Sequence, residues 1–165
     1  MSGFIVTTAD DVVNASDGVI SLREAITLAN ENPDADTITF DASLDGETVT
    51  LSGTELALTS DITIDGDIDG DNVADITIDG NDTSRVFNIS SGGIATLDAL
   101  TITGGNAFSG GGISNYGTAT VTNSTLSGNT AGCGGGISNV RWHCHNDQQH
   151  AERQYGELRR RGLQQ

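Results

Sequence analysis

The sequence predicts an all-β fold, a parallel β-solenoid with a short capping α-helix at its amino terminus. A motif recurs every 24 residues, apolar residues occur in short runs separated by Gly and Asn, and one early segment alone has helical periodicity. The composition agrees, because 22 glycines and 4% aromatic residues are unusual for an ordinary compact core. We divide the chain into an amino-terminal strand and capping helix (1–36), the repeat coils (37–140) and a tail (141–165).

The amino-terminal segment predicts one strand and one helix. "FIVTT" (4–8) has the β-branched residues of a strand. Ser21 followed by Glu24 forms a capping box, and Pro33 ends the helix after about three turns. The apolar residues expected on one face of this helix are Leu22, Ala25, Ile26 and Ala29. A solenoid exposes an apolar end, so we expect this helix to cover it.

The repeat is clearest in the second half of the chain. "GGGISN" occurs at 110–115 and again at 134–139, and "ATVTNSTLSGNTA" from Ala119 matches "ATLDALTITGGNA" from Ala95. The aliphatic pairs aligned by this spacing are Leu97 with Val121, Ile102 with Leu126, and Ile113 with Ile137. A unit this short cannot bury its apolar side alone, so we expect each coil to stack on the next through backbone hydrogen bonds.

An acidic segment, "DGDIDGDNVAD" (65–75), is the candidate metal site. Its carboxylates are Asp65, Asp67, Asp69, Asp71 and Asp75. Alternating carboxylates on a glycine-containing loop are the hard oxygen ligands that Ca²⁺ prefers. An EF-hand pattern counted from Asp65 places Gly70 at the turn but Ile76 where a bidentate Glu is needed. The alternative is a solvated acidic turn between two "DITIDG" strands.

The tail has a different composition. Residues 141–165 hold all three histidines, the only tryptophan and five of the seven arginines. With synonymous codons chosen for the best match, the tail back-translated and read one base later gives "TATMTSSTLSGNTA", which aligns with "TATVTNSTLSGNTA" at 118–131. We interpret it as a fourth repeat translated out of frame and expect it to be disordered. The last coil would then be uncapped and prone to self-association.

This interpretation removes the tail's apparent binding sites. His143, Cys144, His145 and His150 are zinc-ligand types, but an out-of-frame peptide has no selected geometry, so we expect no zinc. "RRRG" (159–162) is discounted as a nucleic-acid patch for the same reason. Cys133 and Cys144 could pair, which says little about the redox compartment.

Charge restricts the partners of the main body. Residues 1–140 carry 20 of the 23 acidic residues and two basic residues, Arg23 and Arg85, a net charge of −18. Such a body disfavours nucleic acids and anionic membranes and suits an extracellular protein or a calcium binder. We see no targeting segment or membrane span, and expect no membrane insertion.

"FIVTTADDVVNASDGVISLREAITLAN" (4–30) resembles the CSLREA-type amino-terminal motif of large bacterial surface or secreted proteins, with Ile20 in place of the cysteine. The "GGGISN" units resemble the repeats of polymorphic outer-membrane-protein and adhesin-like β-helices. Together these resemblances imply a right-handed parallel β-helix at the start of a large secreted or cell-surface protein. They imply no fixed catalytic residues.

The leading functional prediction is therefore a non-catalytic, adhesin-like scaffold that binds an extracellular or host-surface polysaccharide or protein. The alternatives are a calcium-stabilised structural module and a polysaccharide-cleaving β-helix enzyme, either a lyase or a glycoside hydrolase. For the enzyme, the candidate residues are Arg85, Asp79 and Asp82. We interpret these as turn residues and surface charge, and Arg23 and Glu24 as surface charge and helix cap.

Overall fold

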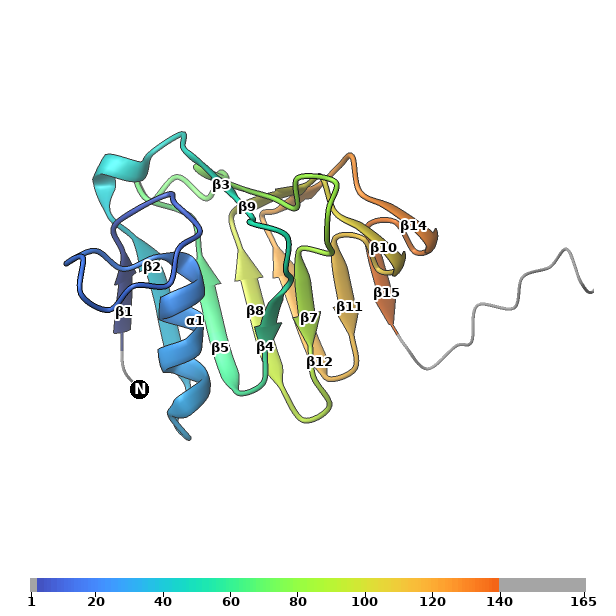
Figure 1. Cartoon of the computed structure of the whole chain (residues 1–165), viewed down its shortest axis with the longest axis horizontal. Helices are drawn as coiled ribbons and strands as arrows, with labels where there is room; N and C mark the ends of the chain where they lie inside the picture. The colour runs from blue at the N-terminus through green and yellow to red at the C-terminus, as the bar shows by residue number, and fades with distance from the viewer. Residues whose placement is uncertain (1–2, 140–165) are drawn as a thin grey trace, which may run out of the picture.

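The computed structural model describes residues 3–139, which form parallel β-strands and one α-helix (Figure 1). The helix is α1 (Leu22–Glu31), and a 3-10 turn, η1, spans Ala42–Leu44. The strands are β1 (Gly3–Val6), β2 (Asp36–Phe40), β3 (Thr48–Thr50), β4 (Leu56–Leu58), β5 (Asp61–Asp65), β6 (Ile76–Asp79), β7 (Phe87–Ile89), β8 (Ile94–Asp98), β9 (Leu100–Thr103), β10 (Asn106–Ser109), β11 (Ile113–Asn115), β12 (Thr118–Thr122), β13 (Thr125–Leu126), β14 (Thr130–Cys133) and β15 (Ile137–Asn139).

The strands form three larger sheets and one two-stranded sheet. Sheet 1 has the order β1-β2-β5-β8-β12, sheet 2 the order β13-β9-β6-β3 and sheet 3 the order β15-β11-β7-β4, while β10 pairs with β14. From β2 onward the chain visits sheets 1, 2 and 3 in turn and then returns to sheet 1 one strand farther along. In the last two passes, β10 and β14 of the two-stranded sheet come between the strands of sheets 2 and 3. All of the strand pairs are parallel, so the fold is an all-β arrangement of parallel sheets with one helix.

The predicted 24-residue register is confirmed in the second half of the chain. Leu97 pairs with Val121, Ile102 with Leu126, and Ile113 with Ile137. The spacing is not uniform, however, since the equivalent steps in sheet 1 are 26 residues from Ile38 to Ile64 and 33 from Ile64 to Leu97. The longer step contains the acidic loop, whose additional residues lie outside the sheets.

The core is built from alternate residues of the strands. In β5 and β8, Ile62, Ile64, Ala95 and Leu97 are fully buried, whereas the intervening threonines are partly exposed. Inward-facing aliphatic side chains of paired strands therefore contact one another along the sheet, and they form one hydrophobic cluster with the helix.

Helix α1 has the predicted boundaries and buried face. Ser21 Oγ accepts a hydrogen bond from the Glu24 amide at 3.1 Å, and Glu24 Oε2 accepts one from the Ser21 amide at 3.0 Å. The predicted residues Leu22, Ala25, Ile26 and Ala29 are all buried. The helix contacts β1, β2 and β5 of sheet 1 and β4 of sheet 3, so it covers the core at the amino-terminal end (Figure 1).

We expect Ser21→Ala to lower the free energy of unfolding by about 1–2 kcal/mol. The substitution removes the cap, and it also leaves the Val12 carbonyl without the Ser21 Oγ donor, which lies at 2.5 Å. Chemical denaturation measures the effect, and Ser16→Ala on the exposed preceding loop serves as the control. Equal unfolding midpoints for the two variants would contradict the capping role.

Candidate metal site

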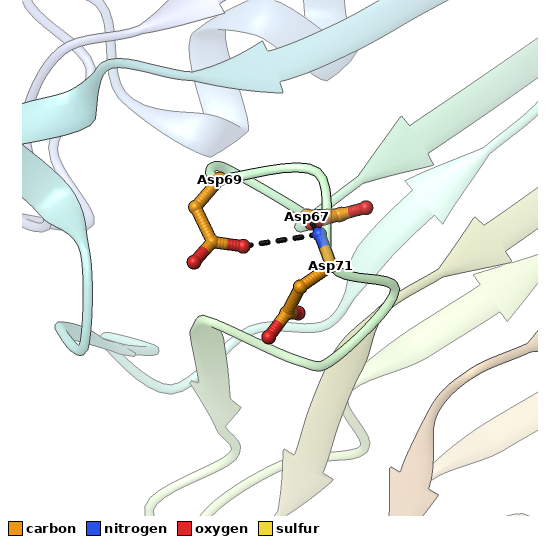
Figure 2. Close-up of side chains that lie close together, drawn as sticks. All are labelled: Asp67, Asp69 and Asp71. Carbon is orange, nitrogen blue, oxygen red and sulfur yellow. Dashed lines mark hydrogen bonds between the residues drawn. The ribbon is translucent and has the colours of Figure 1, made fainter.

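The acidic loop joins β5 to β6 and brings three carboxylates together (Figure 2). Asp67, Asp69 and Asp71 each offer one oxygen, and these oxygens lie within 4.8 Å of one another. Asp67 is half-buried, while the other two are exposed. The chain turns here because Gly70 and Asn72 adopt positive φ, at 84° and 62°.

Backbone amides fix the orientation of the Asp67 carboxylate. Its Oδ1 accepts hydrogen bonds from the Gly70 amide at 2.8 Å and the Asp71 amide at 3.0 Å, and its Oδ2 accepts one from Asn72 at 3.1 Å. Asp69 Oδ1 also accepts from the Asp71 amide, at 3.1 Å (Figure 2). The sequence folds locally in this way because short Asp side chains bond to backbone amides a few residues ahead.

The other two predicted ligands lie at the base of the loop, outside this Asp triad (Asp67, Asp69 and Asp71). Asp65 Oδ1 accepts a hydrogen bond from the Asp67 amide at 3.1 Å, and Asp75 Oδ2 accepts one from the Ile68 amide at 2.7 Å. Their carboxylates hold the loop closed, so the structure brings together three of the five predicted residues.

The structure also shifts the register of the loop by two residues. Counted from Asp67, Asn72 occupies the sixth position of an EF-hand-like pattern, where a positive φ is required, and Asp75 occupies the ninth. The sequence contained this signal, because Asn tolerates positive φ better than most residues. The twelfth position is Ile78, which is fully buried in the core, so the pattern is still incomplete.

Desolvation and like charges raise the pKa of Asp69. The hydrogen bond from the Asp71 amide lowers this pKa, but desolvation and the carboxylates of Asp71, Asp75 and Asp67 together raise it above the usual value. A carboxyl group whose folded pKa is raised weakens folding at neutral pH and weakens it less as the pH falls. A bound divalent cation would relieve the same repulsion. Three clustered carboxylates fit Ca²⁺, which takes six to eight oxygen ligands, the others coming from carbonyls or water.

The ion pair and hydrogen bonds that Arg85 forms in the structure are with residues outside the acidic loop. Its Nη1 pairs with Glu55 Oε2 at 2.6 Å, and its Nη2 donates to the Ser109 carbonyl at 2.8 Å. The prediction of a surface charge is wrong, since only 17% of the Arg85 side chain is exposed. The side chain lies against the carbonyls of the next pass of the chain. Asp82 is a turn residue as predicted, with a φ of 54°. Asp79 is instead the last residue of β6, and its Oδ1 accepts a hydrogen bond from the Asn81 amide in the turn that follows.

Arg23 is likewise not a simple surface charge. Its Nε and Nη2 donate to the two oxygens of Asp11 at 2.7 and 2.8 Å, and the Asp11 side chain is only 2% exposed. Sequence reasoning missed Asp11 and Glu55 as partners. The scarcity of cations was a signal that each arginine would be paired. Residues 3–139 contain two arginines, and each of them forms an ion pair.

The zinc-type residues His143, Cys144, His145 and His150 lie outside the described residues, as does the predicted out-of-frame tail. Comparisons with protein-family models, curated proteins and solved structures gave no match. In the described part of the chain, none of the helices is both long and apolar enough to cross a membrane.

Proposed function

We propose that the chain is a non-catalytic, right-handed parallel β-helix scaffold from a secreted or cell-surface, adhesin-like protein. The observation that carries this proposal is the stacking of identical residues 24 positions apart. Ile113 pairs with Ile137, Ser114 with Ser138, and Asn115 with Asn139, where Nδ2 of Asn115 donates to Oδ1 of Asn139 at 2.8 Å. Repetition of this kind favours a surface extended by copying units, with each unit stabilised by its neighbours.

The role of the polar groups favours a scaffold over an enzyme. The ionic side chains of Arg23 and Arg85 are occupied by Asp11 and Glu55 and by backbone carbonyls. Groups held in this way orient the chain and are poorly placed to exchange protons with a substrate. The ligand that we propose for the scaffold is an extracellular or host-surface polysaccharide or protein.

A panel of neutral and acidic polysaccharides tests the scaffold against the enzyme alternative. We expect the protein to retain some of these polymers on a solid support without releasing reducing ends or unsaturated sugars. Release of products that is abolished by Arg85→Ala, in a variant with an unchanged circular dichroism spectrum, would establish cleavage and overturn the scaffold. Absence of retention on every polymer would remove polysaccharides as its ligands.

The Asp triad favours a second role, a calcium-stabilised structural module. We expect Ca²⁺ to raise the melting temperature and a chelator to reverse the rise, since a ligand at 100 times its Kd contributes about 2.7 kcal/mol. The double variant Asp69→Asn/Asp71→Asn should lose this response. In chelator the double variant should be at least as stable as the wild type, because the repulsion among these carboxylates, which together with desolvation raises the pKa of Asp69, is reduced. Asp45→Asn, in an exposed turn, is the control. A calcium response retained by the double variant would refute the site.

A further inference from the structure

An apolar groove runs between helix α1 and the loop that precedes it. The groove has a volume of about 350 Å³, and its lining includes Val13, Val19, Ile20, Thr27 and Leu28. Val13 is 71% exposed, Val19 38% and Leu28 44%, so three large aliphatic side chains of one site face solvent. Clustered exposure of this kind marks interaction surfaces, whereas single exposed apolar residues do not.

The walls of the groove are fixed by hydrogen bonds. The Asn14 amide donates to Glu24 Oε1 at 2.6 Å, which ties the loop to the helix. At the other end of the loop, the Ile20 amide donates to Thr7 Oγ1 at 2.8 Å, and the Thr7 amide donates to the Ile20 carbonyl at 2.9 Å. The groove is thus already formed in the free protein, which reduces the entropic cost of binding.

The groove is also anionic. Glu24 belongs to its lining, and hydrogen bonds from the Ser21 and Asn14 amides lower the pKa of this carboxyl group, so it is ionised at neutral pH. Asp17 lies in the loop, and Glu31 follows Leu28 by three residues, which places it on the same side of the helix. Within residues 3–139, the one cation of this region is Arg23, which is already paired with Asp11.

We propose that this groove docks a basic amphipathic segment of a partner protein. Apolar side chains of the segment would fill the groove between Val13 and Leu28, and its Lys or Arg side chains would lie against Glu24, Asp17 and Glu31. Charge complementarity selects this partner over a second copy of the folded body, since residues 1–140 carry a net charge of −18. The proposal does not depend on the scaffold role, because the groove belongs to the amino-terminal unit alone.

A fluorescent amphipathic peptide of Leu and Lys in a helical pattern serves as the probe, and a peptide with Glu in place of Lys as its control. We expect the full chain to bind the Lys peptide with a micromolar Kd that increases with salt. Val13→Gln/Leu28→Gln should weaken binding at least tenfold, although it changes no charge. Phe108→Gln, which removes an apolar side chain that is 82% exposed elsewhere, should leave the Kd unchanged.

Three results would each overturn the proposal. The first is equal binding of the Lys peptide by the wild type and Val13→Gln/Leu28→Gln, because the peptide would then bind through the overall negative charge of the protein and not through the groove. The second is equal binding of the Glu peptide. The third is a concentration-dependent increase in size without peptide that the double variant abolishes, because a second copy would then occupy the groove. None of these results bears on the polysaccharide test of the scaffold.

Discussion

Replacing Arg23 with alanine is expected to lower the free energy of unfolding by about 3–5 kcal/mol, the usual cost of leaving a buried charge without its partner. Arg23 donates to both oxygens of Asp11, to the Glu55 carbonyl at 3.1 Å and to the Thr54 carbonyl at 2.9 Å. It therefore joins helix α1 to the segment between β3 and β4. The Asp11 carboxylate would keep only its bonds from Ser52, at 2.7 and 2.9 Å.

The pH dependence of this loss identifies Asp11 as the responsible group. Burial raises the pKa of Asp11, but hydrogen bonds from Arg23 and Ser52 and the Arg23 charge lower it below 3.8 overall. A lowered folded pKa gives stability that is present above the unfolded pKa and is lost as the pH falls through the folded value. Without Arg23 the pKa of Asp11 rises. The stability difference between wild type and Arg23→Ala should therefore narrow as the pH falls below about 4.

Two variants control this experiment, with urea unfolding as the measurement. Arg23→Lys keeps the charge but lacks the planar fork that bonds both oxygens, so it should lose less stability than Arg23→Ala. Arg23→Met/Asp11→Asn removes both charges and should also be less costly than Arg23→Ala, since no uncompensated carboxylate remains. If the double variant were as unstable as Arg23→Ala, the buried charge of Asp11 would not be the cause.

The parts of the fold that the sequence predicted have local or repeated signals. The cap of α1 depends on two residues three positions apart, Ser21 and Glu24, and the strand register follows from a motif that occurs twice at a fixed spacing. The ion pair of Arg85 with Glu55 has neither signal, because the partners are 30 residues apart in passes of unequal length. The unequal length of the passes also explains why the 33-residue step from Ile64 in β5 to Leu97 in β8 was not predicted.

The candidate site was predicted in composition but not in geometry. Alternating Asp residues identified the loop, yet which carboxylates converge depends on where the chain reverses. That point is set by the positive φ of Asn72 as well as of Gly70. Counting from the first Asp of the run therefore placed Asp65 among the ligands, whereas its carboxylate accepts a hydrogen bond from the Asp67 amide at the base of the loop.

The second large effect is expected at Gly112, where alanine should lower the free energy of unfolding by about 1–3 kcal/mol, the usual cost of overpacking. A Cβ at Gly112 would lie 2.6 Å from the Gly136 carbonyl oxygen, which belongs to the next pass of the chain. That carbonyl cannot move aside, because it accepts a hydrogen bond from the Ile113 amide at 2.8 Å. Glycine at position 112 is thus required by the close approach of the backbone in the next pass of the chain.

Gly136 is the matched control, since it is the same position of the motif 24 residues later. Among the described residues, a Cβ at Gly136 would come no closer than 3.8 Å, to Leu126 Cβ, which is an ordinary contact. We expect Gly136→Ala to be neutral or stabilising by up to about 1 kcal/mol, through the reduced entropy of the unfolded chain. Urea unfolding measures the free energy of unfolding of both variants. Equal losses of this free energy in Gly112→Ala and Gly136→Ala would contradict the claim that the backbone of the next pass requires glycine at position 112.

The same pair of glycines tests whether the chain is a repeating stack. In a variant whose residues 140–165 are replaced by a copy of residues 116–139, a further coil would place a backbone carbonyl over Gly136. Gly136→Ala should then lower the free energy of unfolding as much as Gly112→Ala does. The reason is that the added Cβ meets the coil that follows, and not the coil that contains the glycine. If Gly136→Ala is still tolerated in the extended chain, and circular dichroism shows that the added residues are folded, the result would contradict the proposed parallel β-helix. Equal losses of stability at Gly112 and Gly136 in the extended chain would mean that each coil restricts the side chains of the coil before it. This restriction would explain why "GGGISN" recurs with its glycines intact.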